Sequence, residues 1–299
     1  MSEPPSLRIT TVLYENDVDT VDRLVQSVVR SVEHARSSGA CGAVSYHIGD
    51  CSSRPALAER DVERVLTGRG GGVLADVGYE FFGANLGHAG GSNRLLEGAT
   101  EDVVFLVNPD CYLGPHLVEQ LLAAFTDAAV GLAEARQLPA EHPKAYDPFS
   151  LRTGWSSLAC AAVRQTAVQR VGPLDGDCFP MYCNDVDWSW RLRLAGFTLA
   201  YQPSAVVFHD KRVDTDGRVR PSGTEEYYAA EAGLLLRHKY SRPDLVSGLL
   251  RQLEEGPPVQ RRAAEAYRVR LSTGALPAAL DAEHRVAEFV DGNYARHRW

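Results

Sequence analysis

The sequence predicts an α/β protein with an open, mostly parallel central sheet flanked by helices. Apolar segments of strand length alternate with segments that carry apolar residues at helical spacing, up to about residue 209. Several strand-like segments end in a polar turn that contains a carboxylate. Alternation of this kind is typical of parallel strands joined by helical crossovers. Helical patterns dominate from Glu225 onward, so we predict a domain over residues 1–240 and a helical extension over residues 241–299.

Each element is predicted from its own residue pattern. Residues 7–14 alternate β-branched side chains, as a strand does, and residues 103–107 are all apolar, as in a strand that is buried on both faces. Apolar residues at helical spacing predict a helix over residues 20–36, with Asp17 or Asp19 as its N-cap. Further strands are expected over residues 43–48, 130–135 and 199–208, an apolar segment lies over 158–163, and further helices are expected over residues 54–66, 95–99, 115–125, 164–171 and 184–195. Loops over residues 68–72, 137–153 and 211–223 are candidates to close over a ligand.

The composition limits the class of protein. With 299 residues, 44% of them hydrophobic, the chain can bury a core large enough for an enzyme. A net charge of −8 argues against nucleic acid as the main partner, because a phosphate backbone requires a basic surface. Six scattered cysteines without a Cys-x-x-Cys pair are typical of a reduced compartment. No apolar run approaches the ~20 residues of a membrane helix, and the N-terminus lacks the pattern of an export signal. We therefore expect a cytoplasmic protein, with peripheral attachment to the inner face of the membrane as an alternative.

Two carboxylates follow directly on predicted strands. Asp110 lies in an Asn-Pro-Asp turn after residues 103–107, and Asp50 follows the strand over residues 43–48. Ligands of open α/β sheets bind at the carboxyl edge of the strands, so both residues are placed to meet a ligand. The alternative is structural: Asp110 would belong to an ordinary turn, and Asp50 would cap the turn that contains Ser52 and Ser53.

Four segments, in this order, resemble the family 2 glycosyltransferases with the GT-A fold, and among them the bacterial rhamnosyltransferase-like branch. They are residues 49–53, 85–93, 106–110 and 184–188, the last together with Arg191 and Gly196. Each motif alone is unspecific, whereas their joint order and spacing is a specific signal. The resemblance implies an inverting glycosyltransferase that moves a sugar from a UDP- or dTDP-sugar to an acceptor hydroxyl, with a divalent metal on the diphosphate.

On the donor side, the resemblance implies a set of residues along the nucleotide sugar. It places Tyr14 and Asp50 at the base, where a carboxylate accepts a hydrogen bond from the ring N–H of uracil or thymine. Asn108 stands where the metal motif of the family usually has its first Asp, so it would bring an amide to the ribose or sugar and no charge. Glycines in residues 85–93 would let the backbone approach the ligand. The implied donor-binding set is Tyr14, Asn16, Asp50, Asn85, Gly87, Gly91, Asn93, Asn108 and Asp110.

By the same resemblance, Asp110 and His209 hold the metal. A departing diphosphate requires charge neutralisation, which a divalent cation supplies through its oxygen ligands. A neutral imidazole suits Mn²⁺ better than Mg²⁺, so we favour Mn²⁺. Because Asn108 carries no charge, we expect weaker metal binding that depends more on the phosphates of the donor.

The motif over residues 184–187 resembles the Glu-Asp-x-Asp of the family and makes Asp185 the catalytic base. This carboxylate would take the proton of the acceptor hydroxyl as its oxygen attacks the anomeric carbon from the face opposite the diphosphate. The alternative is that Asp185 and Asp187 cap the helix, and Asp187 could do so while Asp185 reacts. Asn184 replaces the usual Glu, which would change how the acceptor is held. We place Trp155, Asn184, Asp187 and Trp188 on the acceptor side, with core packing as the alternative for the two tryptophans.

Two other functions stay open at this point. A sugar-nucleotidyltransferase would also bind a nucleotide on such a sheet, but residues 7–16 lack the Gly-rich, basic loop that it requires. A non-catalytic nucleotide-sugar binding module is suggested by the amides of Asn108 and Asn184 and opposed by Asp110, Asp185 and His209. The acceptor could be a glycan, a lipid-linked molecule or a small molecule, and the C-terminal helices are candidates for a homodimer contact.

Overall fold

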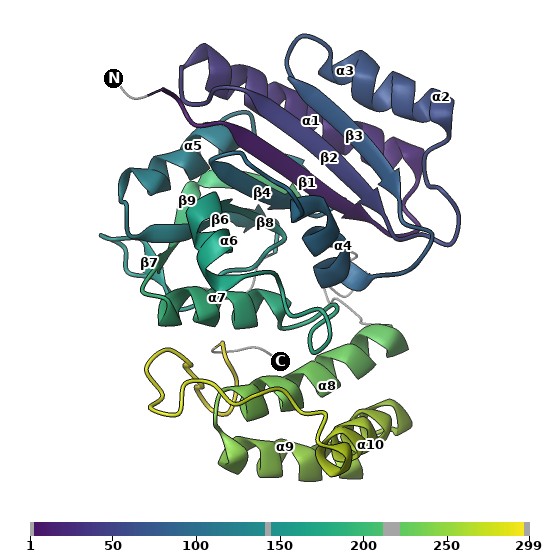
Figure 1. The fold of residues 1–299 in the computed structure, drawn as a ribbon, viewed down its shortest axis with the longest axis vertical. Helices are drawn as coiled ribbons and strands as arrows, with labels where there is room; N and C mark the ends of the chain where they lie inside the picture. The colour runs from purple at the N-terminus through teal and green to yellow at the C-terminus, as the bar shows by residue number, and fades with distance from the viewer. Residues whose placement is uncertain (1–2, 141–144, 212–221, 296–299) are drawn as a thin grey trace.

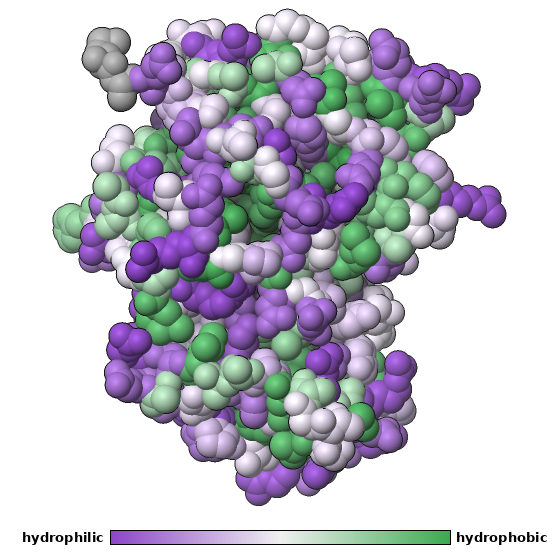
Figure 2. All heavy atoms as spheres, in the orientation of Figure 1, coloured by the Kyte–Doolittle hydropathy of each residue, from purple (hydrophilic) through white to green (hydrophobic). Residues whose placement is uncertain are grey.

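The computed structural model describes residues 3–140, 145–211 and 222–295. An α/β part built on one large sheet lies above a smaller group of three helices in the view of Figure 1. Figure 2 shows hydrophilic and hydrophobic residues interspersed over this face, as on an ordinary protein surface. Within the described ranges, no helix is both long enough and apolar enough to cross a membrane.

One half of the sheet is parallel, as predicted. Its strands, in spatial order, are β3 (Asp76–Phe81), β2 (Val44–Asp50), β1 (Leu7–Leu13) and β4 (Val103–Val107). Leu13 pairs with Asp50, so the loops that follow β1 and β2 emerge side by side. In β4, Phe105 packs into the core on one face and Leu106 into the core on the other, which explains the continuous apolar run in the sequence.

The other half of the sheet is mixed. It contains β8 (Cys160–Arg164), β6 (Val130–Leu138), β9 (Thr198–His209), β5 (Cys111–Leu113) and β7 (Arg152–Thr153). Strand β8 runs antiparallel to its neighbours β4 and β6, and β6 runs parallel to β9. Strand β5 runs antiparallel to β9 with Cys111 opposite His209. The turn at Asp110 and the end of β9 therefore meet at one edge.

Helices cover both faces of the sheet. Helices α1 (Val18–Ser37) and α5 (Leu117–Ala123) pack on one face, and α6 (Gln165–Val171) and α7 (Asn184–Leu194) pack on the other. Of the two predicted caps of α1, Asp17 is the one used, since its carboxylate accepts a hydrogen bond from the backbone N–H of Thr20 at 2.7 Å.

Some local predictions were wrong. Strand β3 was not predicted, and the helix expected over residues 54–66 begins only with α2 (Glu59–Val62). The glycines expected to form a loop at residues 68–72 partly continue this helical segment as α3 (Gly68–Gly70). The helix expected over residues 95–99 instead lies mostly within the glycine-rich segment, as α4 (Gly87–Leu96). Close packing outweighs the low helix propensity of glycine there, because a Cβ atom on Gly91 would lie 2.7 Å from the side chain of Val12.

The C-terminal region begins with three helices that pack on one another. They are α8 (Gly223–Lys239), α9 (Pro243–Glu255) and α10 (Pro258–Thr273), and a proline begins each of the last two. Residues 275–295 are mostly irregular and return to α8, where Arg237 Nη2 donates to the backbone carbonyl of Gly292 at 2.6 Å. The predicted boundary at residue 240 falls between α8 and α9 and stays a prediction. Of the predicted loops, residues 141–144 and 212–221 lie outside the described ranges.

Candidate functional site

The strongest pair of candidate residues lies where β4 and β9 end. Asp110 follows β4, and His209 is the last residue of β9. The pairing of β5 with β9 brings His209 Nε2 to 3.2 Å from Asp110 Oδ1. His209 is almost fully buried, whereas Asp110 is partly exposed, so the pair opens to solvent on the carboxylate side. The structure thus joins two residues that stand 99 positions apart in the sequence.

Gln137 sets the orientation of the His209 ring. Its Oε1 lies 2.8 Å from His209 Nδ1. An amide oxygen only accepts hydrogen bonds, so this contact places an imidazole proton on Nδ1, and Nε2 is the ring nitrogen that faces Asp110 and could bind a metal. We missed Gln137 in the sequence, because its contact depends on the pairing of β6 with β9, which no local pattern reveals.

The donor atoms at this edge fit a divalent cation. Asp110, Cys111 and His209 each offer one ligand atom within 4.8 Å of the others. Burial raises the pKa of the Cys111 thiol well above its usual range, so the neutral thiol is a poorer ligand than the other two groups. A carboxylate oxygen and an imidazole nitrogen remain, and this mixed set suits Mn²⁺ when phosphate oxygens complete the shell.

Asp185 lies in the first turn of α7 and is half-buried. The residue before the helix, Cys183, has a left-handed backbone with φ of 60°, an uncommon conformation for a non-glycine residue that turns the chain sharply into α7. Asp185 Oδ1 accepts from the backbone N–H of Val186 at 2.8 Å. Backbone N–H groups at a helix start stabilise a carboxylate anion, which suits a general base.

Asp187 does not contact an acceptor, nor does its side chain cap α7. Its side chain is fully buried and binds three partners: Arg191 Nε at 2.9 Å, Lys239 Nζ at 2.7 Å and the Tyr240 hydroxyl at 3.1 Å. Two of these partners come from the end of α8 and the residue after it, so Asp187 ties α7 to the C-terminal helices. Both of our expectations for this residue were wrong, because two of its three partners lie 52 and 53 positions further along the chain.

The two tryptophans also lie in the core. Trp188 is fully buried, and its Nε1 donates to the backbone carbonyl of Gly172 at 3.0 Å. Trp155 is 6% exposed and packs edge-on against Tyr294, with ring centroids 5.2 Å apart. Neither ring presents a face to a sugar, which corrects the acceptor-side prediction in favour of the core-packing alternative.

Asn184 is likewise buried, with 3% of its surface exposed. Its Nδ2 lies 2.9 Å from Nδ1 of His88, and its Oδ1 accepts from the backbone N–H of Asp185 at 2.9 Å. These contacts leave little of Asn184 accessible to an acceptor, and its acceptor-side role stays a prediction. Its position indicates that it orients the start of α7.

His88, on the first turn of α4, was not among the predicted site residues. Burial lowers the pKa of its imidazole to about 4, and a hydrogen bond with the side chain of Asn108 offsets this only in part. His88 is therefore neutral at pH 7 and contacts both Asn108 and Asn184. One signal in the sequence pointed to this role: His88 lies in the glycine-rich segment over residues 85–93, which we assigned to the donor.

Asp50 caps the turn that contains Ser52, which was the structural alternative to ligand binding. Its carboxylate is fully buried and accepts hydrogen bonds from the backbone N–H groups of Ser52 at 2.9 Å and Ala56 at 2.7 Å, and from the Tyr79 hydroxyl at 2.5 Å. Tyr14, in contrast, is 57% exposed beside the same edge, and its backbone N–H donates to Asn16 Oδ1 at 2.9 Å. Base binding by Asp50 stays a prediction, and Tyr14 has the more accessible side chain.

The residues around α4 also form structural contacts. Asn85 Oδ1 accepts from the backbone N–H of Gly87 at 3.0 Å. The amide of Asn93 exchanges two hydrogen bonds with the backbone of Leu174, at 2.8 and 2.9 Å, so it is not aimed at ribose or phosphate as we expected. Gly87 has φ of +68° and lies against Pro180, where a Cβ atom would meet the backbone carbonyl at 2.7 Å. Gly91 packs on Val12, so its lack of a side chain serves helix packing and not ligand approach.

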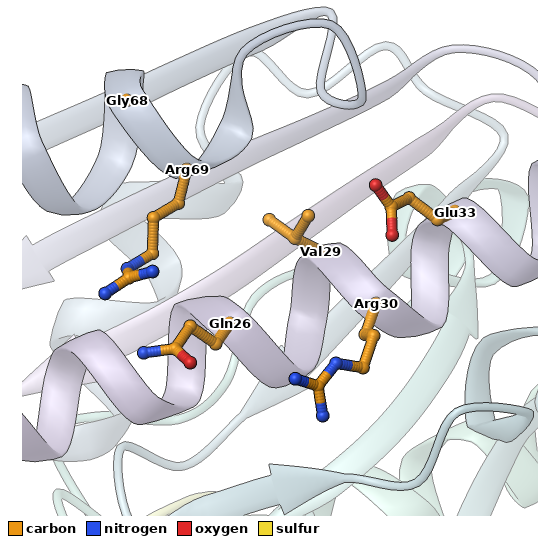
Figure 3. A pocket seen from close by; sticks show the side chains of 6 residues that line it. All are labelled: Gln26, Val29, Arg30, Glu33, Gly68 and Arg69. Carbon is orange, nitrogen blue, oxygen red and sulfur yellow. The ribbon is translucent and has the colours of Figure 1, made fainter.

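A hollow of about 290 Å³ lies elsewhere, between α1 and α3 (Figure 3). Its lining consists of Gln26, Val29, Arg30, Glu33, Gly68 and Arg69. None of these is a predicted site residue, and the basic side chains stand beside the acidic Glu33. We therefore place the candidate site at the strand ends and not in this hollow.

Comparisons with known proteins concern the fold and the class of enzyme. No family model matches the chain. The N-acetylglucosaminyl-diphospho-decaprenol L-rhamnosyltransferase of Mycobacterium tuberculosis, from strains CDC 1551 / Oshkosh and ATCC 25618 / H37Rv, is 30% identical over 44% of this chain and 58% of its own length. The chain therefore spans less than two thirds of that relative.

Two solved glycosyltransferase structures share the fold. The mannosyltransferase PcManGT from Pyrobaculum calidifontis, in complex with GDP-Man and Mn²⁺, superposes with a TM-score of 0.56 at 15% identity, over 94% of this chain and 78% of that one. GalNAc-T7 with UDP, GalNAc and Mn²⁺ superposes with a TM-score of 0.63 at 12% identity, over 93% of this chain and 60% of that one. The chain therefore has the GT-A fold and is similar to the family 2, rhamnosyltransferase-like glycosyltransferases, as its four sequence motifs indicated.

Proposed function

We propose that this chain is a metal-dependent, inverting glycosyltransferase that uses a nucleotide sugar, with a UDP- or dTDP-sugar as the expected donor. The observation that carries the proposal is the pairing of Asp110 with His209, whose Nε2 lies 3.2 Å from the carboxylate while Gln137 holds Nδ1 of the ring. The similarity to a rhamnosyltransferase supports the reaction class, and both solved neighbours were obtained with Mn²⁺ and a nucleotide or nucleotide sugar.

In the proposed reaction, Asp185 accepts the proton of the acceptor hydroxyl. The oxygen of that hydroxyl forms a bond to the anomeric carbon, and the bond from this carbon to the diphosphate oxygen breaks on the opposite face. The nucleoside diphosphate leaves with the electron pair, and the anomeric configuration inverts. A divalent metal held by Asp110 and His209 would neutralise the charge that develops on the diphosphate. Asn108, which is half-buried beside Asp110, is proposed to donate an amide hydrogen bond to the ribose or sugar.

The proposal is tested by a screen of UDP-, dTDP- and GDP-sugars for thermal stabilisation of the protein with and without Mn²⁺, followed by an assay of donor hydrolysis. A ligand that binds only the folded state raises the melting temperature in proportion to its affinity and concentration. Metal-dependent stabilisation and slow hydrolysis with one donor class would support the proposal. Stabilisation without any turnover would favour the non-catalytic binding module, for which the amides of Asn108 and Asn184 argue.

Asp110→Ala is expected to abolish the Mn²⁺-dependent part of donor stabilisation. This substitution removes the charged ligand of the metal, and without the metal the diphosphate of the donor is not neutralised. Melting curves of the variant with donor, with and without Mn²⁺, should coincide. The matched control is Asp210→Ala, which removes an exposed carboxylate one residue after His209 and should keep the response. An unchanged metal response in Asp110→Ala would rule out Asp110 as the ligand.

Gln137→Leu is expected to weaken Mn²⁺ binding by about 10–100-fold while the fold is kept. The substitution removes the acceptor that holds the His209 proton on Nδ1, and partners of this kind usually contribute that much to metal affinity. Titration of Mn²⁺ followed by electron paramagnetic resonance measures the free ion directly. Gln202→Leu is the control, because this buried amide of β9 binds the backbone carbonyl of Gln120 and not His209. Equal affinity in the Gln137 variant and the wild type would contradict the assignment.

A further inference from the structure

The side chains of Asn108, His88 and Asn184 form a continuous polar chain across the site. Asn108 belongs to the metal turn after β4, and Asn184 is the first residue of α7. His88, from α4, lies between them: its Nδ1 is 2.9 Å from Asn184 Nδ2, and it also hydrogen-bonds with the side chain of Asn108. Three elements that are separate in the sequence are thereby joined through one imidazole.

The hydrogen-bonding groups of the three side chains are complementary. The neutral imidazole of the half-buried His88 has one nitrogen that accepts and one that donates, and each side-chain amide can serve as the partner of either. A carboxylate at position 108 or 184 would instead favour the protonated ring, and at the buried position 184 it would bring a charged pair out of water. The two amides that replace the usual carboxylates of the family are therefore compatible with a neutral His88.

The chain of contacts ends at the proposed catalytic base. Asn184 Nδ2 faces His88, and this fixes the Oδ1 of the same amide toward the backbone N–H of Asp185, at 2.9 Å. Rotation of the amide by half a turn would place its NH₂ group against that N–H and lose this hydrogen bond, and it would keep the one to His88 only if the ring changed to the tautomer with a proton on Nδ1. The His88 ring therefore selects the orientation of Asn184 and, through it, the backbone position of Asp185.

The backbone around His88 is anchored independently of its side chain. Gly87 packs against Pro180, and the backbone N–H of Ala89 donates to the Pro180 carbonyl at 3.1 Å. The start of α4 is thus attached to the segment that leads into α7. A substitution at position 88 can change the side-chain contacts while these backbone contacts hold the ring position in place.

On the basis of the proposed function, we propose that His88 is a positioning residue that couples the donor-side amide of Asn108 to the placement of the catalytic base Asp185. His88 does not touch the reacting atoms. It acts through Asn184 on the turnover number and through Asn108 on the affinity for the donor. These two effects can be separated, because they pass through different contacts of the ring.

The test compares His88→Leu with His88→Asn. Leucine fills a similar volume without hydrogen bonds, and we expect about a tenfold lower kcat together with about a tenfold higher donor KM, the range for a lost buried hydrogen bond. The side-chain oxygen of asparagine takes the place of Nδ1, so His88→Asn should keep the contact with Asn184 and lose the one with Asn108. We therefore expect a kcat within about threefold of the wild type and a donor KM that stays raised.

A double variant checks the route through Asn184. In an Asn184→Leu background, His88→Leu should lower kcat by no more than about twofold further, because the contact that carries the effect is already gone. The matched control is His47→Leu. His47 is a half-buried histidine of β2 that has no contact with Asn184, and burial lowers its pKa too. This variant should lower the melting temperature without changing kcat or donor KM.

The outcomes separate this inference from the proposed function. Absence of transfer and hydrolysis in the wild type would overturn the proposed function and the inference with it. If the wild type turns over and His88→Leu lowers only the melting temperature, with kcat and donor KM unchanged, the inference alone is overturned. If His88→Leu does not fold, His88→Asn decides: a folded variant whose kcat falls tenfold, despite the retained contact with Asn184, also overturns it.

Discussion

Asp185→Asn is expected to lower turnover by about 100-fold or more while donor affinity stays nearly unchanged. The amide keeps the size of the side chain and can still accept from the backbone N–H of Val186 through its oxygen, so α7 should begin as before. It cannot take the proton of the acceptor hydroxyl, and the attack of the oxygen loses its general base. Steady-state kinetics with the donor identified by the screen, and calorimetric titration of that donor with Mn²⁺, measure the two quantities separately.

The control for this variant is Glu97→Gln, which removes one negative charge from an exposed position at the end of α4. It shows whether net charge alone affects the kinetic constants. Turnover of Asp185→Asn within a few-fold of the wild type would exclude Asp185 as the base. An equal loss of donor affinity and turnover would instead assign Asp185 to the donor side.

The sequence was sufficient where a residue pattern reflects a local physical cause. The continuous apolar run of β4 follows from burial on both faces, and the alternation in β1 and the periodicity of α1 follow from one buried face each. Strand β3 was missed because most of it is exposed or half-buried at the edge of the sheet and contains two acidic residues. Helix α4 was missed because its glycines favour a loop locally, and only its packing on β1 stabilises the helix.

In the candidate site, too, a residue was predictable where its position in the sequence alone indicates its place in the fold. Asp110 and His209 stand at strand ends, and the fold brings strand ends of this type together, so their proximity could be expected. The assignments of Trp155, Asp187 and Trp188 to the acceptor were wrong, because their burial is decided by partners from other parts of the chain, such as Tyr294 and Lys239.

Gln137 and His88 could not be found from the sequence for a related reason. Each acts on a predicted residue, one on His209 and the other on Asn184, and neither lies near that residue in the sequence. Residues that orient the functional groups become visible only when the side chains are placed. The residues that carry chemistry were thus predicted more easily than the residues that position them.

Lys239→Met is expected to lower the free energy of unfolding by about 3–5 kcal/mol, the usual cost of removing one partner from a buried ion pair. Lys239 is almost fully buried at the end of α8, and its Nζ donates to Asp187 Oδ1 at 2.7 Å and to Asp175 Oδ2 at 2.6 Å. Methionine has a similar length and no charge, so both carboxylates lose a cation while the packing is largely kept. Urea denaturation followed by circular dichroism and by tryptophan fluorescence measures the change, and coincident transitions would verify two-state unfolding.

Acid should remove part of the same stabilisation from the wild type. Burial alone would raise the pKa of Asp175, but the hydrogen bond and charge of Lys239 outweigh it and hold the pKa below the ordinary value of 3.8. The unfolded chain therefore binds more protons near that pH, and stability should fall as the pH decreases through 3.8 toward the lower pKa of the folded state. In Lys239→Met the contribution of Asp175 to this acid-induced loss should be smaller, because the cation that lowers the pKa is absent.

The position of Lys239 makes this variant a test of how the C-terminal helices serve the site. Asp187 lies two residues after Asp185 on α7, so the contact from Lys239 holds the same helix that presents the proposed base. Arg242→Met is the matched control, since it removes a cation three residues further on that pairs with the exposed Asp244, and it should change stability much less. Equal effects of the two substitutions would show that the buried cluster of Asp175, Asp187 and Lys239 does not stabilise the junction between α7 and α8.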